Sequence, residues 1–110
     1  MPARRFARQW AAHLAAVNIP VHGEDELVDV LEDLLARVLV ALANPAWDPA
    51  IGENLGIAVA DLGFRSPAVI DASLPTLREV CRHAGAPPEV LTSLASRFGL
   101  GVGRSLTSES

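Results

Sequence analysis

The sequence of 110 residues has no lysine, only one cysteine and no long apolar run. The single cysteine, Cys81, excludes an intrachain disulfide and any zinc cluster built from several cysteines. The longest uninterrupted apolar stretch, Val38–Ala43, is far shorter than the roughly 20 residues that a membrane-spanning helix requires. We therefore expect a soluble, cytoplasmic protein without membrane insertion.

The charge balance is acidic, and all nine basic residues are arginine. Thirteen acidic residues give a net charge of −4 at pH 7, which argues against a nucleic-acid partner because phosphate binding needs a basic face. Arg4, Arg5 and Arg8 form a small basic cluster, which we interpret as the solvated end of a helix. Arginine in place of lysine, together with abundant alanine, indicates a GC-rich genome such as that of an actinobacterium.

Signals for helix starts recur along the chain. Asp48 and Ser66 each stand directly before a proline, which is favourable in the first helical turn because its missing N–H needs no partner there. Their side-chain oxygens can accept hydrogen bonds from the first free backbone N–H groups. Apolar residues between such signals recur at helical spacing, which predicts an all-α protein, a compact four- to five-helix bundle. The expected helices span residues 2–17, 24–44 (the second and central helix), 49–63, 67–84 and 88–98.

Two segments make the helix boundaries less regular. Pro75 lies inside the apolar pattern of the fourth helix, which favours either a kink or two helices with Ser73 capping the second, with the break near residues 72–74. After Phe98 the pattern fades into three glycines at alternate positions and a polar end. We therefore expect one bundle domain over residues 1–98, followed by a linker or frayed helical extension over 99–110.

Gly52 and Gly56 leave a smooth strip on the third helix, where another helix could approach closely. Each glycine costs about 0.5–1 kcal/mol of helix stability relative to alanine, so a packing reason is expected. One use of the strip is a homodimer surface, since two-fold pairing is the commonest closed assembly. The alternative is that the small-residue surfaces of the chain pack inside a single bundle.

The residues that could carry chemistry do not form a catalytic or metal-binding pattern. His13, His22 and His83 are not spaced at i+3 or i+4, so we expect no metal site. Cys81 lies on an apolar stripe and is expected to be a buried small side chain. The acidic residues of segment 24–33 are expected to form a solvated face rather than a general acid and base. No nucleophile elbow, phosphate loop or dinucleotide fingerprint is present, and we expect no enzymatic activity.

A ligand pocket is the alternative to a purely regulatory role. Trp47, Phe64 and His83 are the residues that we expect to line such a pocket, as an apolar cavity with a convergent polar group. No cofactor is expected, but the alternative that remains open is haem with His83 as its axial ligand.

Four stretches resemble the helical N-terminal region of actinobacterial cyclic-di-GMP signalling proteins: Trp47–Pro49, Gly52–Gly56, Leu62–Ile70 and Leu74–Leu77. In that family a similar segment precedes sensor modules of the PAS type and the GGDEF and EAL enzymatic domains. The chain is also similar, more distantly, to the globin-like sensor domains of stressosome-type regulators. It contains no GGDEF or EAL motif, so the resemblance transfers no catalytic residue. It implies a non-enzymatic sensory, regulatory or dimerisation module that acts on attached or associated signalling domains.

The fold class can be checked by circular dichroism in the far ultraviolet. We expect the double minimum of an α-helical protein, because the apolar residues between the helix-start signals recur at helical spacing. A spectrum with substantial strand content would contradict the predicted bundle.

Overall fold

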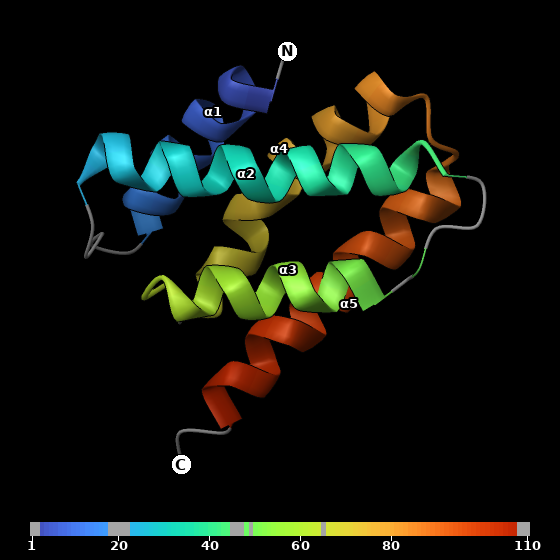
Figure 1. The fold of residues 1–110 in the computed structure, drawn as a ribbon. Coiled ribbons are helices and arrows are strands. Elements are labelled where there is room, and N and C mark those ends of the chain that lie inside the picture. The colour runs from blue at the N-terminus through green and yellow to red at the C-terminus, as the bar shows by residue number, and fades with distance from the viewer. Residues whose placement is uncertain (1–2, 18–22, 45–47, 49, 65, 108–110) are drawn as a thin grey trace.

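The computed structural model describes residues 3–17, 23–44, 48, 50–64 and 66–107. These residues form an all-α bundle, as predicted, with five helices in the described part of the chain. The helices are α1 (Ala3–Val17), α2 (Glu24–Leu42), α3 (Ala50–Asp61), α4 (Ala68–Ala84) and α5 (Pro88–Thr107). α1 packs on α2 and α3 packs on α5, while α4 contacts both pairs and lies behind α2 and α3 in Figure 1.

The predicted helix-start residues act at the positions that the sequence indicated. The Asp48 carboxylate accepts a hydrogen bond from the Ala50 N–H at 2.9 Å, just before α3. The Ser66 hydroxyl accepts one from the Ala68 N–H at 3.3 Å, at the start of α4. α4 ends at Gly85, whose φ of 70° is left-handed and therefore favours glycine.

The core is organised around Trp10, which is fully buried and joins three helices. Its indole N–H donates to the Ser73 hydroxyl on α4 at 2.8 Å, and that hydroxyl donates to the Val69 carbonyl at 2.7 Å. Its ring lies 6.3 Å from the ring of Phe98 on α5. Because its polar group is satisfied inside the core, the largest buried side chain among the described residues has no unpaired donor.

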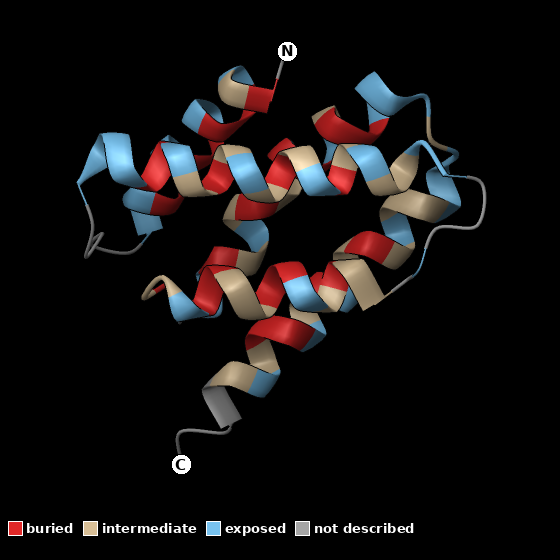
Figure 2. Ribbon diagram, viewed as in Figure 1, coloured by how far each residue is buried: buried red, intermediate tan, exposed pale blue. Residues whose placement is uncertain are grey.

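α2 is less enclosed than expected for a central helix. Val40 is 70% exposed, and Leu34 and Leu39 are only partly buried. Figure 2 shows exposed and buried residues alternating along α2, whereas α4 lies deeper, between α1 and α5. α2 therefore forms one face of the bundle, and the side of α2 that points away from the core is exposed to solvent.

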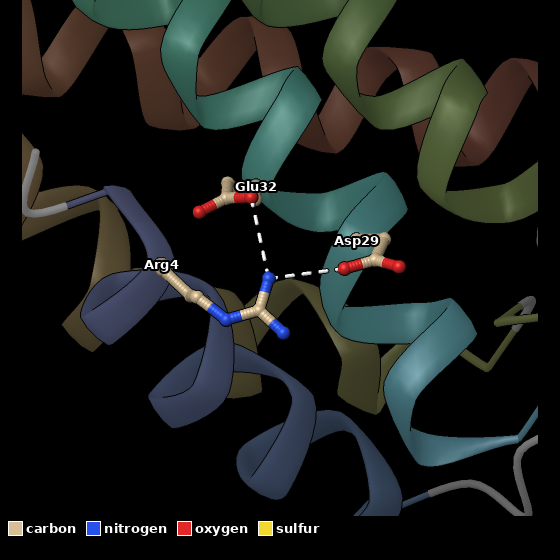
Figure 3. A network of polar contacts seen from close by, with 3 residues as sticks. All are labelled: Arg4, Asp29 and Glu32. Atoms are coloured by element: carbon tan, nitrogen blue, oxygen red, sulfur yellow. Dashed lines mark hydrogen bonds and ion pairs between the residues drawn. The ribbon is translucent and has the colours of Figure 1, made fainter.

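Arg4 fixes α1 to α2 at the surface. Its Nη1 atom lies 3.0 Å from the carboxylate of Asp29 and 3.4 Å from that of Glu32, as Figure 3 shows. The hydrogen bond to Asp29 is the main reason why the pKa of Arg4 is raised. One arginine of the cluster predicted to be solvated thus pairs with part of the acidic segment of α2.

Pro75 does not divide α4, which is one helix from Ala68 to Ala84, so the alternative of two separate helices is wrong. Pro75 lacks the N–H that would bond to the carbonyl of Asp71, and both residues are exposed. Water can therefore satisfy that carbonyl. Ser73 is not a cap but a buried partner of Trp10.

The expected helix end at Phe98 is also wrong, because α5 continues to Thr107, in line with the alternative of a helical extension beyond residue 98. Gly101 and Val102 are buried, so this part of the chain belongs to the bundle rather than to a linker. The reason is tertiary contact: a Cβ atom on Gly101 would overlap the backbone of Glu53 on α3. Packing of backbone against backbone compensates for the low helix propensity of the glycines.

The smooth strip of α3 is filled by α5 of the same chain. A Cβ atom on Gly52 would lie 2.8 Å from the Leu94 carbonyl oxygen. One on Gly56 would overlap the Phe98 carbonyl oxygen. The prediction that another helix approaches closely here is confirmed, and the strip is not exposed to a second copy in this arrangement.

Two glycine-to-alanine substitutions separate packing from helix propensity. Gly56→Ala is expected to lower the free energy of unfolding by about 1–3 kcal/mol or more, because its methyl group meets backbone atoms that cannot rotate away. Gly103→Ala, in the same pair of helices, has nothing within 4 Å of the new methyl group and is expected to stabilise by about 0.5–1 kcal/mol. Urea denaturation measures both, and similar effects of the two substitutions would contradict the close packing.

Candidate functional site

A pocket of about 300 Å³ lies between α2 and α3. Side chains spaced by three, four or seven residues line it, so that one stripe of each helix forms one wall. The lining residues are Leu34, Arg37 and Val38 of α2 and Ile51, Asn54, Leu55 and Ala58 of α3. Its volume is at the lower end of the range of small-molecule sites.

The pocket has an apolar floor and a polar rim. Val38 and Leu55 are 2% and 3% exposed and join the core of the bundle. Ile51 is partly buried, whereas Arg37 and Asn54 are exposed. An apolar body would therefore contact the floor while a polar group met the guanidinium and the amide at the rim.

Arg37 is the one charged residue among the described residues that line the pocket. Its Nη2 atom lies 2.9 Å from the Asp33 carboxylate, one turn earlier on α2. Both side chains are more than half exposed, at 75% and 62%, and an exposed pair of this spacing contributes only about 0.3–0.5 kcal/mol. The pair therefore orients the guanidinium without making it unavailable to an incoming anion.

α3 separates the pocket from α5. Ile51, Leu55 and Ala58 line the pocket, while Gly52 and Gly56 contact the backbone of α5. A displacement of α3 would therefore change both the shape of the pocket and the position of α5, because the close-packed backbones of α3 and α5 have no empty space between them.

An ion pair holds the same two helices together further along. Glu53 of α3, whose side chain is 17% exposed, pairs with Arg104 in the last turn of α5. This pair connects the far end of α5 to the helix that forms one wall of the pocket.

Two of the three residues predicted to line a pocket, Phe64 and His83, lie in different surroundings in the described structure. Phe64 is 1% exposed and belongs to the core. His83 is exposed in the last turn of α4, with its ring 5.8 Å from that of Phe6 in an edge-on arrangement. Neither lines the α2–α3 pocket. Trp47 lies outside the described residues.

The sequence did not lead us to predict the α2–α3 pocket, although part of the apolar pattern that lines it can be seen there. The second half of α2 carries more apolar side chains than one buried face requires, and Ile51 and Leu55 form a stripe on α3. The distance between the two helices is a tertiary property, however. It depends on the contacts that each helix makes elsewhere.

The described residues contain no candidate metal site. No group of three or more His, Cys, Asp or Glu side chains in that part of the chain could hold a metal ion. None of the helices in this part of the chain is both long enough and apolar enough to cross a membrane.

Comparisons with protein-family models, with curated proteins and with solved structures found no match to this chain.

Cys81 provides a chemical check on the core. It is 3% exposed, and burial raises the pKa of its thiol. Because the thiolate is the reactive form, alkylation at mildly alkaline pH is expected to be at least about tenfold slower in the native protein than in concentrated urea. Mass spectrometry after timed iodoacetamide treatment measures the two rates. Equal rates would contradict the burial of this face of α4.

Proposed function

We propose that this chain is a non-enzymatic sensory or regulatory module of a multidomain bacterial signalling protein. The observation that carries the proposal is the position of α3, with a solvent-accessible pocket on one side and a backbone contact with α5 on the other. A sensor needs a site and a rigid element that both the site and the output can bias. α3 and α5 have this arrangement.

In the proposed mechanism, a ligand between α2 and α3 changes the separation of these helices. α3 then moves together with α5, because Gly56 and Gly101 leave no gap between the two backbones. The last turns of α5 point away from the rest of the bundle towards the C-terminus (Figure 1). A displacement there would change the orientation of whatever domain α5 contacts or continues into.

The resemblance to the helical N-terminal regions of cyclic-di-GMP signalling proteins supports the same role. Under this proposal the output is a GGDEF or EAL domain, either attached to this chain or associated with it. Homodimerisation remains a separate expectation. In the arrangement described, Gly52 and Gly56 are covered by α5, so pairing of two copies would use other surfaces.

The proposal is tested in the complete protein encoded by the reading frame that contains this chain. Ala58→Leu places a larger apolar side chain in the pocket and acts as a permanent partial occupant. It is expected to change cyclic-di-GMP synthesis or hydrolysis about fivefold or more, the usual lower range of allosteric coupling. The measurement is the rate of nucleotide turnover by liquid chromatography.

Ala16→Leu is the matched control, because Ala16 is exposed on α1 and away from the pocket lining. It makes the same chemical change and is expected to leave turnover unaltered. Identical turnover in the wild type and Ala58→Leu contradicts the proposal, as does a complete protein that neither contains nor binds such an effector.

A further inference from the structure

The chemistry of the α2–α3 pocket identifies a class of ligand. We propose that the pocket binds an aliphatic carboxylate of medium chain length, with its tail on the apolar floor and its carboxylate at Arg37. The inference rests on the proposed sensory role of this pocket and adds the identity of the signal. Three properties of the pocket support it: the charge of its lining, its volume, and the absence of aromatic side chains among the described lining residues.

The charge favours an anion. Arg37 contributes the only formal charge among the described lining residues, and no carboxylate lines the pocket there. A guanidinium has five donors in a planar fork that matches a carboxylate. The bond to Asp33 uses one edge of an exposed side chain, so a ligand carboxylate can share or replace it.

Asn54 provides a second polar group at the rim of the pocket. Arg37 lies near the end of α2 and Asn54 near the start of α3, and the two helices run in opposite directions (Figure 1). Both residues are exposed at the rim. The Asn54 amide can donate to the second oxygen of a carboxylate bound by Arg37, which fixes the orientation of the head group.

The rest of the lining favours a flexible aliphatic tail. Leu34, Val38, Ile51 and Leu55 present branched aliphatic side chains, and Ala58 leaves space between them. An aromatic or nucleotide ligand would find no ring to stack on among the described lining residues. A volume of about 300 Å³ suits a small ligand rather than a large cofactor.

The test is a titration of the ¹⁵N-labelled chain with sodium octanoate, followed by NMR. Shift changes are expected to concentrate on Leu34, Asn54, Leu55 and Ala58, and to saturate. Octylammonium, which has the same tail and the opposite charge, is expected to bind about tenfold more weakly or not at all. Absence of saturable shifts, shifts spread over the whole surface, or equal binding of octylammonium would each overturn the proposal.

Two pairs of variants localise the site. Arg37→Gln is expected to weaken octanoate binding about tenfold, while Arg78→Gln, an exposed arginine of α4, leaves it unchanged. Ala58→Leu is expected to abolish binding by filling the pocket, and Ala16→Leu to have no effect. Unaltered affinity in Arg37→Gln would overturn the assignment of the carboxylate.

The result can be separated from that of the proposed function. If octanoate does not bind but Ala58→Leu still changes nucleotide turnover in the complete protein, the ligand class is wrong and the sensory role stands. If octanoate binds at the pocket but turnover is insensitive to Ala58→Leu, the ligand class stands and the coupling to α5 is wrong.

Discussion

Direct contact between the backbones of α3 and α5 is the constraint on which the rest of the structure depends. Gly52, Gly56 and Gly101 make it possible, since a Cβ atom at any of them would meet backbone atoms of the other helix. Three glycines inside helices are unfavourable for isolated helices. Here they allow close contact over a long stretch of both backbones, and the resulting dispersion interactions offset that cost. The same contact explains why α5 continues as a helix beyond Phe98.

This constraint also accounts for the pocket. α3 is held close to α5, and the Glu53–Arg104 ion pair reinforces that position. α2 is held against α1 by its apolar face and by the pairing of Arg4 with Asp29 and Glu32. α2 therefore packs most closely on α1, and α3 packs most closely on α5. The side chains of α2 and α3 do not fill the space between these two helices. The proposed site therefore lies where the α1–α2 and α3–α5 helix pairs are less closely packed against each other.

Local signals were sufficient to predict the elements but not their arrangement. Asp48 and Ser66 identified helix starts because capping depends on neighbouring residues alone. The role of the glycines after Phe98 depends on α3, and local propensity suggested a linker or a frayed helical extension instead. Phe64 belongs to the core and does not line the α2–α3 pocket for a similar reason, since an apolar ring is as suited to a core as to a ligand site. Gly52 and Gly56 were correctly associated with close helix packing, whereas their partner helix could not be deduced from spacing.

The contact between α3 and α5 can be observed directly by nuclear Overhauser spectroscopy on the labelled chain. A Cβ atom on Gly56 would lie 3.1 Å from the Gly101 Cα and 2.9 Å from the Val102 nitrogen, so the Gly56 Hα in that direction lies close to protons of both residues. The account predicts strong cross-peaks from the Gly56 Hα protons to the Gly101 Hα protons and to the Val102 amide proton. Their absence in a folded, helical sample would contradict the packing from which the pocket and its coupling to α5 are derived.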